Sequence, residues 1–383
     1  MRKLLIYGDS PVATTGLGKL HKQLIQKLSQ DFEITIVGLN HSVIWADEKE
    51  YKCKIYPASI APQDRAFGVD LMNYVLANET FDVILTSHDL NRILPFINKL
   101  KELQIKGTKW INYAPLDRVE FNQIEADLLE LPDVSLLYSD YALNQLRKRN
   151  PKTKARRIYL PVDSELYPLD AGAFRSGMLK IDDKDFLFTA VGRHIERKDH
   201  ARLLQAFKIV HKKNKRIKLY IHCSKEDQAG KIKDMLEMLE LNDGSVILAD
   251  MDSNVSGVDP ATLNLIYNAT DCVVSASRGE GFGYSTVEAL ATKTAFIGPN
   301  NTSFPELLGN GKFGTLVPIK TTIITGLGIR ELIDIEALAE GMYDCFLNYK
   351  EYEQKAEEGY EFTQNNLTLD IIYAQWKEAL SSV

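Results

Sequence analysis

The sequence predicts an α/β protein made of two domains, each a doubly wound parallel sheet covered by helices, that face a central cleft. The chain has 383 residues, more than the roughly 250–300 at which a single hydrophobic core stops growing. Short apolar segments alternate with amphipathic helical segments, as in parallel sheets that are buried on both faces. This alternation breaks off after the first half of the chain and begins again near residue 186.

Each half of the chain supplies its own series of strands and helices. In the first half we expect strands at 3–7, 32–37, 82–86, 109–113 and 134–138, and helices at 19–28 and 70–77. In the second half we expect strands at 186–191, 218–222, 246–248, 272–275 and 295–297, and helices at 200–211, 231–239, 260–268 and 286–291. A last amphipathic helix is expected at 369–380.

A linker near 163–182 separates the two series and predicts domains at 1–165 and 166–360. Ligands of open α/β sheets bind at the carboxyl ends of the strands, so the site is expected in the cleft between the domains.

Composition narrows the class of protein. The net charge of −6 gives no general attraction to nucleic acid or to an anionic membrane. The cysteines are scattered, which indicates reduced thiols, a cytoplasmic protein and no metal site. No apolar stretch approaches the length of a membrane span. Two basic stretches, 147–157 and 208–216, could dock on anionic lipid or on nucleic acid, although such runs are more often solvated surface.

The segment 271–291 carries the strongest chemical signal. An apolar strand leads into a glycine-rich loop and then a helix, so backbone N–H groups and a helix N-terminus are available to a phosphate. Glu280 and Glu288 are eight residues apart and suit the hydroxyls of a hexose and a ribose. The alternative is a loop charge and a solvated helix residue, which explains neither the glycines nor the following helix. The other candidate ligand-binding residues of this segment are Gly281, Phe282, Gly283, Ser285 and Thr286.

A second candidate segment, 192–199, follows the first strand of the second series. Its glycine frees the end of the strand, and the cations Arg193 and Lys198 follow in one loop. Such cations neutralise a diphosphate and stabilise it as it departs. An ordinary basic helix start is disfavoured, because cations destabilise a helix N-terminus.

The third candidate segment is the loop after the first strand. Gly16 and Gly18 form only part of the dinucleotide-binding pattern, whose last glycine is replaced by His21. No acidic residue closes a clear second strand either, so a dehydrogenase is disfavoured. A glycine pair that faces the phosphate site of the opposite domain is the remaining functional interpretation.

Together these segments resemble glycosyltransferase family 4, whose members are retaining enzymes with the GT-B fold of two Rossmann-like domains. Glu280 and Glu288 match the Glu-x7-Glu donor motif of that family, and 300–308 resembles its next donor-side loop. The similarity is specific over 186–318 and holds only in outline for the first half. The segments 112–117 and 279–284 are similar to those of viral and environmental members.

The resemblance implies a reaction and a set of roles. The reaction is metal-independent, front-face transfer of a sugar from a UDP- or GDP-sugar, with no cofactor. Arg193 and Lys198 would bind the diphosphate, Glu288 the ribose and Glu280 the transferred sugar. Gly16 would lie against the phosphates from the other domain. The segment 361–383 would cross back to the first domain.

The first domain departs from the family pattern. Many relatives carry a His-Asp pair after the fourth strand, where this chain keeps only Asp117. His88, after the preceding strand, could orient an acceptor or the sugar, or could satisfy its own loop. The catalytic candidates are therefore Glu280, Asp117 and His88.

The acceptor is the least determined part of the hypothesis. A glycan, lipid-linked or protein-linked acceptor is the first expectation, and a modified DNA base is an alternative. Two other classes are a non-catalytic nucleotide-sugar binder and an epimerase of the same fold. The four charged donor-site residues argue against the binder, and no acid/base pair at fixed spacing supports the epimerase.

Overall fold

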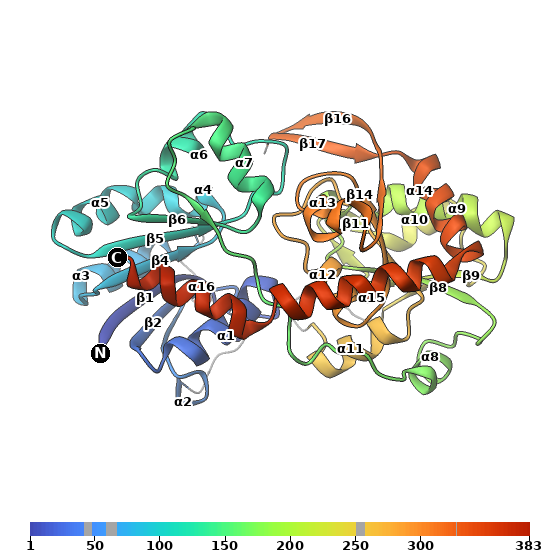
Figure 1. Cartoon of the computed structure of the whole chain (residues 1–383), viewed down its shortest axis with the longest axis horizontal. Coiled ribbons are helices and arrows are strands. Elements are labelled where there is room, and N and C mark those ends of the chain that lie inside the picture. Colours follow the sequence, from blue (N-terminus) through green and yellow to red (C-terminus); the bar gives the residue numbers. More distant parts are fainter. Residues whose placement is uncertain (42–47, 59–66, 250–256, 327) are drawn as a thin grey trace. The chain divides into compact units, whose positions relative to one another are not determined.

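The computed structural model describes residues 1–41, 48–58, 67–249, 257–326 and 328–383, which form two compact units (Figure 1). The first unit comprises Met1–Leu116, Phe121–Pro161 and Leu369–Val383. The second unit comprises Asp117–Glu120 and Val162–Thr368. The last helix therefore belongs to the first unit, and the short segment 117–120 to the second.

In the described part of the first unit, a seven-stranded parallel sheet has the order β3-β2-β1-β4-β5-β6-β7. Because the strand order reverses at β1, right-handed crossovers place helices on both faces of the sheet. The strands are β1 (Arg2–Asp9), β2 (Phe32–Leu39), β3 (Lys54–Pro57), β4 (Val83–Ser87), β5 (Lys109–Ala114), β6 (Val134–Leu137) and β7 (Arg156–Arg157). The helices are α1 (Gly16–Leu28), α2 (Glu48–Tyr51), α3 (Val69–Asn78), α4 (Leu90–Ile93), the 3₁₀ helix η1 (Leu94–Phe96), α5 (Ile97–Ile105), α6 (Gln123–Leu128), α7 (Asp140–Arg149) and α16 (Leu369–Ser381).

In the described part of the second unit, a six-stranded parallel sheet has the order β12-β9-β8-β13-β14-β15. Its strands are β8 (Phe186–Val191), β9 (Ile217–His222), β12 (Val246–Leu248), β13 (Cys272–Val274), β14 (Ala295–Pro299) and β15 (Thr315–Val317). Two antiparallel hairpins accompany it, β10 (Glu226–Asp227) with β11 (Gly230–Lys231), and β16 (Ile319–Thr325) with β17 (Gly328–Ile333).

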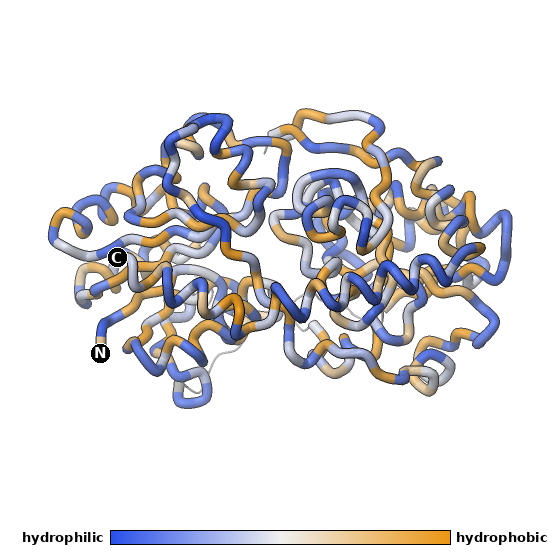
Figure 2. Tube along the Cα trace, in the orientation of Figure 1, coloured by the Kyte–Doolittle hydropathy of each residue, from blue (hydrophilic) through white to orange (hydrophobic). Residues whose placement is uncertain are grey.

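The helices of the second unit are α8 (Gly172–Gly177), the 3₁₀ helix η2 (Glu196–Lys198), α9 (His200–Lys213), α10 (Ile232–Met238), α11 (Pro260–Asn268), α12 (Tyr284–Ala291), α13 (Phe304–Leu307), the 3₁₀ helix η3 (Gly309–Gly311), α14 (Ile335–Leu347) and α15 (Tyr349–Asn366). Figure 2 shows that α15 is largely hydrophilic along its length. A glycine nevertheless lets it approach α12 closely, because a Cβ on Gly359 would lie 2.5 Å from Leu290. This contact holds in place the helix that carries Glu288.

All ten strands and all seven helices that the sequence predicts are confirmed, with end points that differ by a few residues. The predicted α/β class, with a parallel sheet in each half of the chain, is confirmed as well. In the described parts of the chain, no helix has the length and hydrophobicity that a membrane crossing requires. The cleft between the two domains stays a prediction.

Candidate functional site

The loop between β13 and α12 has a backbone that requires glycine. Gly279 has a φ of +148° and Gly283 a φ of +105°, both in the region that disfavours other residues. A Cβ on Gly279 would also lie only 2.3 Å from the carbonyl oxygen of Asp117. The positive φ therefore explains both glycines, and close packing of the backbone adds to the requirement at Gly279.

Two hydroxyls of the following loop fix the glycine-rich segment. The Glu280 N–H donates to Thr302 Oγ1 at 2.9 Å, and the Ser303 hydroxyl donates to the Phe282 carbonyl oxygen at 2.5 Å. Phe282 is buried beneath the loop. The segment 300–308, noted for its resemblance to a donor-side loop, thus supports the loop that precedes α12.

Glu280 is a buried carboxylate that two cations hold in place. Its side chain Oε1 accepts from Lys198 Nζ at 2.7 Å, and Oε2 pairs with Arg197 Nη1 at 2.6 Å. Burial raises the pKa of Glu280, but the adjacent charges of Arg197 and Lys198 outweigh it and bring the pKa to about 2. The carboxylate is therefore ionised throughout the neutral range.

Gly192 provides the space that Lys198 needs to reach Glu280. Gly192 has a φ of +145°, and a Cβ there would lie 3.2 Å from Lys198 Nζ. Lys198 ends the short helix η2, which directly follows β8 and its loop. The predicted glycine and lysine thus pack against each other at the carboxyl end of β8.

The two arginines of this loop have different surroundings. Arg197, which was not among the predicted site residues, also donates to the carbonyl oxygen of Gly279 at 2.6 Å. Arg193, which was predicted, forms a two-pronged pair with Asp227, from Nε at 3.1 Å and from Nη2 at 3.0 Å. Its side chain is 53% exposed. The structure brings Lys198 to Glu280 as expected, but it places Arg197 there and directs Arg193 to the β10–β11 hairpin.

Asp117 lies in the second unit, between two arginines. Its Oδ2 lies 3.3 Å from Arg197 Nε, and its Oδ1 lies 3.0 Å from Arg330 Nη1. Arg330 also donates to the backbone carbonyl of Asp117 and is almost completely buried. Arg330 lies on β17, far from every motif in the sequence, so no local signal could have identified it.

Glu288, the second glutamate of the motif, has a neutral partner. It faces inward from α12, and its Oε2 accepts from the Tyr267 hydroxyl at 2.7 Å. Burial and the charge of Glu288 raise the pKa of Tyr267 well above its ordinary value, so the phenol remains a donor. In the described part of the chain, the buried hydroxyl oxygens of Tyr284 and Thr286 have no hydrogen-bond partner. The first turn of α12 thus presents unsatisfied hydroxyls beside the glycine-rich loop, and Ser285 is half-buried there.

The predicted residues of the first unit surround the end of β1. Gly16 begins α1, and the preceding Thr15 caps that helix and donates to the carboxylate of Asp9. His88 Nε2 lies 3.4 Å from Asp9 Oδ1, while His88 Nδ1 accepts from the Asp89 N–H at 2.8 Å. Because a backbone N–H can only donate, Nδ1 accepts and Nε2 carries the proton toward Asp9. His88 therefore both accepts a hydrogen bond from the backbone of its own loop and faces the buried carboxylate of Asp9.

His21, which interrupts the dinucleotide-binding pattern, is also part of this polar cluster. It is fully buried, with Nδ1 at 2.6 Å from the Asp9 carbonyl oxygen and Nε2 at 2.9 Å from the Ser87 hydroxyl. Burial lowers its pKa, so it is a neutral imidazole that donates from Nδ1. A Cβ on Gly8 would lie 2.5 Å from its ring. A buried histidine thus stands where the dinucleotide-binding pattern has its last glycine.

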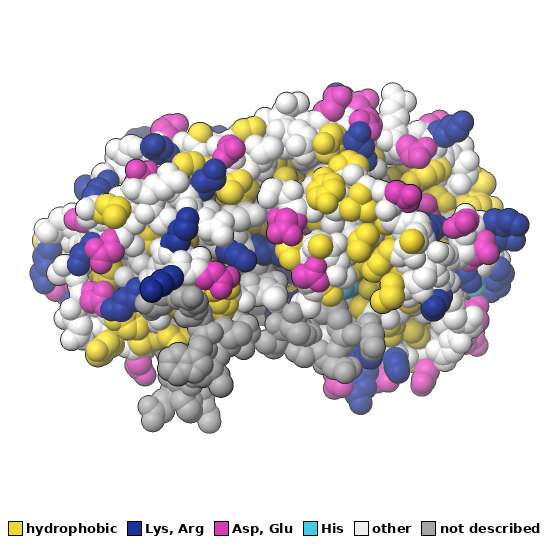
Figure 3. Space-filling view, turned by 90° about the horizontal axis from the view of Figure 1, so that it is seen from below, with side chains coloured by type: hydrophobic (Ala, Val, Ile, Leu, Met, Phe, Trp, Pro, Cys, Tyr) yellow, Lys and Arg dark blue, Asp and Glu magenta, His cyan; other side chains and the backbone are white. Residues whose placement is uncertain are grey.

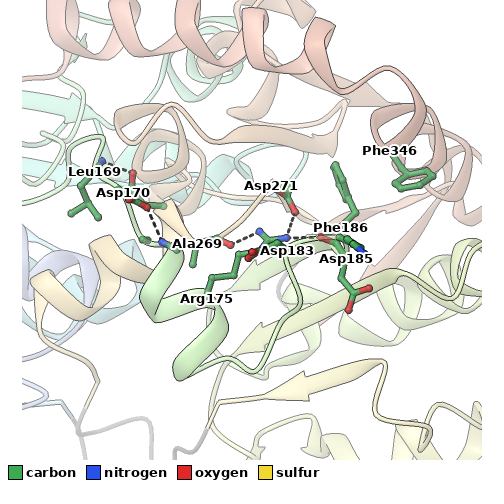
Figure 4. Close-up of a pocket in the computed structure, with 13 residues that line it drawn as sticks. Leu169, Asp170, Arg175, Asp183, Asp185, Phe186, Ala269, Asp271 and Phe346 are labelled. Carbon is green, nitrogen blue, oxygen red and sulfur yellow. Dashed lines mark hydrogen bonds and ion pairs between the residues drawn. The ribbon is translucent and has the colours of Figure 1, made fainter.

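A cavity of about 460 Å³ in the second unit is distinct from these clusters (Figure 4). It lies at the start of β8 and β13, beside Phe186 and Asp271. Arg175 occupies its centre and donates to Asp271 at 2.8 Å and to the Ala269 carbonyl oxygen at 2.7 Å. Because ligands of such sheets bind at the carboxyl ends of strands, this cavity is not the candidate site. In the described residues, no group of His, Cys, Asp and Glu side chains could hold a metal ion.

Residues 176–362 match the family model described as glycosyl transferases group 1. This match covers just under half of the chain. The resemblance that the sequence showed over 186–318 is thereby confirmed, and the Glu280–Glu288 segment lies within the matched region of the group 1 glycosyl transferases.

Two curated relatives also match parts of the chain. The chain is 26% identical over 179 residues to the capsular polysaccharide biosynthesis glycosyltransferase CapM of Staphylococcus aureus, over 47% of this chain and 45% of the relative. It is 24% identical over 271 residues to the alpha-monoglucosyldiacylglycerol synthase of Streptococcus pneumoniae, over 69% of this chain and 56% of the relative. The chain spans about half the length of these relatives.

Solved structures confirm the GT-B fold. Sucrose-phosphate synthase from Thermosynechococcus elongatus matches with a TM-score of 0.78 and 16% identity, over 100% of this chain and 99% of that one. HepE from Anabaena, solved in complex with UDP-glucose, matches with a TM-score of 0.72 and 14% identity, over 100% of both chains. At these identities the likeness establishes the fold alone.

Proposed function

We propose that this protein is a retaining glycosyltransferase that moves a sugar from a nucleotide-diphosphate sugar to a hydroxyl acceptor. The observation that carries the proposal is the buried, ionised carboxylate of Glu280, held by Arg197 and Lys198 beside a glycine-rich loop and the start of α12. A carboxylate suits sugar hydroxyls, and the cations and the helix N-terminus suit a diphosphate. The match of residues 176–362 to the group 1 glycosyl transferases supports the same reaction class.

Donor binding would exchange partners within this cluster. Both oxygens of Glu280 now accept from cations, at 2.7 Å from Lys198 and 2.6 Å from Arg197. A bound diphosphate would compete for these cations and would release a carboxylate oxygen to accept from a sugar hydroxyl. The backbone N–H groups of Gly281 and Gly283 would complete the diphosphate site.

The nucleoside would lie toward the other end of α12. Glu288 would accept from the ribose hydroxyls, and Tyr267 would orient its carboxylate through the 2.7 Å hydrogen bond. The unsatisfied hydroxyls of Thr286 and Tyr284 are additional donors, and Ser285 would contribute its own. We assign Phe282 to packing beneath the loop rather than to direct binding, because it is buried there.

Two further residues would reach the phosphates only under stated conditions. Arg193 would first have to leave Asp227, which now holds it at 3.0 Å and 3.1 Å. Gly16, at the start of α1 in the first unit, would offer its backbone N–H to an anion, as helix N-termini do. We therefore rank Lys198 and Arg197 above both as diphosphate ligands.

The reaction would proceed with retention by front-face attack, with the leaving phosphate accepting the proton of the acceptor hydroxyl. Arg197 and Lys198 would stabilise the charge on the departing diphosphate, so the mechanism needs no metal ion. His88 presents a proton from Nε2 toward Asp9, which suits it to orient a substrate hydroxyl rather than to remove a proton. Asp117 would act by holding Arg197. Transfer should therefore persist in excess chelator, and a loss that Mg²⁺ reverses would refute the metal-free mechanism.

The donor is proposed to be a UDP-sugar, because HepE of the same fold was solved with UDP-glucose. The test is a thermal-shift screen against UDP-, GDP- and ADP-sugars, followed by NMR determination of the anomeric configuration of the product. We expect a shift with a UDP-sugar and a product with retained configuration. No shift with any of them would refute donor binding, and an inverted product would refute the retaining mechanism. A shift without transfer to any acceptor would favour the non-catalytic binder.

The acceptor is proposed to be a lipid-linked or membrane-borne hydroxyl. One relative is named as a synthase of a glycosylated diacylglycerol. The first unit exposes a basic cluster at the end of α7 and just beyond it, formed by Arg147, Lys148, Arg149, Lys152 and Lys154. On the face shown in Figure 3, by contrast, positive and negative side chains are interspersed. Such a cluster would hold the protein at an anionic bilayer.

Vesicle co-sedimentation tests this docking. Phosphatidylglycerol vesicles should retain the protein, and phosphatidylcholine vesicles should not. Changing Lys148, Lys152 and Lys154 to glutamate should release it, whereas changing Lys212 and Lys215, which are exposed on the second unit, should have little effect. Equal retention of both variants would refute the proposed surface. Retention by duplex DNA instead would favour the nucleic-acid acceptor.

A further inference from the structure

The β16–β17 hairpin places an arginine next to the candidate site. The two strands pair antiparallel after the last strand of the sheet, and their outer residues are exposed, as at Ile324. Arg330 is a charged residue of β17 that is nevertheless buried, since only 6% of it is exposed. Its Nη1 lies 3.0 Å from Asp117 Oδ1, and it also donates to the carbonyl oxygen of Asp117. A charged group is expensive to bury, so this placement calls for an explanation.

The same strand holds the residues that follow Asp117. The Val119 N–H donates to the Ile329 carbonyl oxygen at 3.2 Å. Gly328 has a φ of +113°, and a Cβ there would lie 2.8 Å from Arg118 Cδ. Consecutive residues of β17 therefore fix consecutive residues of the segment 117–120.

Arg330 ends a chain of charges that alternate in sign. Arg330 pairs with Asp117 at 3.0 Å, and Asp117 with Arg197 at 3.3 Å. Arg197 pairs with Glu280 at 2.6 Å, and Glu280 with Lys198 at 2.7 Å. Because Asp117 binds Nε of Arg197 and Glu280 binds Nη1, the two carboxylates together set the plane of the guanidinium group. Asp117 is itself 29% exposed, so it needs Arg330 to remain in this orientation.

We propose that Arg330 is a positioning residue for donor binding. It fixes Asp117, and Asp117 fixes the guanidinium group of Arg197 in the orientation that receives the donor diphosphate. The β16–β17 hairpin is thus a part of the donor site that no sequence motif reveals. This inference rests on the proposed function, because it takes Arg197 as a diphosphate ligand.

The test compares Arg330→Gln, Arg330→Lys and the wild type in binding the nucleotide sugar that stabilises the wild type in the thermal-shift screen. In Arg330→Gln, the Kd for the nucleotide sugar should be about tenfold weaker and the donor KM about tenfold higher. The acceptor KM should be unchanged. Arg330→Lys, which keeps the charge, should recover part of this loss. Lys320→Gln is the matched control, because Lys320 lies on the same hairpin, is 65% exposed and pairs with Asp334.

A double-mutant cycle with Arg197→Met separates positioning from general support of the fold. If Arg330 acts through Arg197, adding Arg330→Gln to Arg197→Met should weaken the Kd by less than about twofold more. An unchanged Kd in folded Arg330→Gln, or a full additional loss in the double variant, would overturn the inference alone. If the glutamine variant fails to fold, a folded Arg330→Lys variant with the same Kd as the wild type would also overturn the inference. Failure of the wild type to bind any nucleotide would overturn the proposed function as well.

Discussion

Replacing Glu280 with glutamine should reveal how strongly the cation pair stabilises the second unit. The variant keeps the size of the side chain and removes its charge, which leaves Arg197 and Lys198 without their shared carboxylate. The surrounding cations lower the pKa of Glu280 from an ordinary value of 4.5 to about 2. At about 1.4 kcal/mol per pKa unit, this difference corresponds to about 3 kcal/mol of folding free energy.

The sign of the pH dependence follows from the direction of the shift. Because the pKa of Glu280 is lower in the folded state, its contribution is fully present above pH 4.5 and is lost as the pH falls toward 2. Glu280→Gln should therefore be less stable than the wild type by about 3 kcal/mol at pH 7, and the gap should narrow below pH 4.5. Other carboxylates titrate in both proteins, so the difference between the two curves isolates Glu280.

Urea denaturation followed by circular dichroism between pH 7 and pH 2.5 measures this gap. A gap that stays constant over the whole range would refute the electrostatic account of Glu280. The same variant should also lose sugar transfer by at least about a hundredfold while binding nucleoside diphosphate no more weakly, since the competing carboxylate is gone. Wild-type turnover in Glu280→Gln would refute its place in the donor site.

Three further changes test the neighbours of Glu280. Lys198→Met should weaken nucleotide binding about ten- to hundredfold by calorimetry, the range for a hydrogen bond to a charged group, and an unchanged Kd would contradict its role. Arg193→Ala should weaken binding less than about threefold, because its side chain is 53% exposed and is held by Asp227. A loss equal to that of Lys198→Met would show that Arg193 changes partners. Tyr267→Phe should lower stability by about 1 kcal/mol and raise the donor KM severalfold, because it removes the hydroxyl that orients Glu288. A donor KM like that of the wild type would remove Tyr267 from the site.

The strands that the sequence predicted share a physical property that those it missed lack. Each predicted strand carries an apolar run, and all of them except the half-buried edge strand β12 are mainly buried. The missed strands β3 and β7 lie at the two edges of the first sheet and are short and half-exposed. The hairpin strand β16 is exposed at most positions and rich in threonine, so it shows neither an apolar run nor a clear alternation.

The residues of the candidate site also fall into two groups, those predictable from one local segment and those brought together only by the fold. Gly192, Lys198 and Glu280 could be predicted, because their spacing follows from one strand, one loop and one helix start. Whether Arg193 or Arg197 reaches Glu280 depends on the direction of each side chain from one loop. Both residues are arginines, so the sequence alone does not distinguish them. Arg330 meets Asp117 across 213 positions of the chain, so only the folded structure brings the two together.

The pairing of every cation in the cluster has a consequence for catalysis. Since Arg197 and Lys198 already bind carboxylates, a ground-state donor would replace existing ion pairs rather than create new ones, and the loss of those pairs would offset part of the gain in affinity. As the sugar departs, however, the diphosphate gains negative charge while the carboxylates of Glu280 and Asp117 do not. The attraction of the two cations for the diphosphate therefore increases most in the transition state, which is the condition under which binding energy accelerates a reaction. The glycine-rich loop adds backbone donors that need no such exchange, so the loop would contribute mainly to affinity and the cations to both affinity and rate.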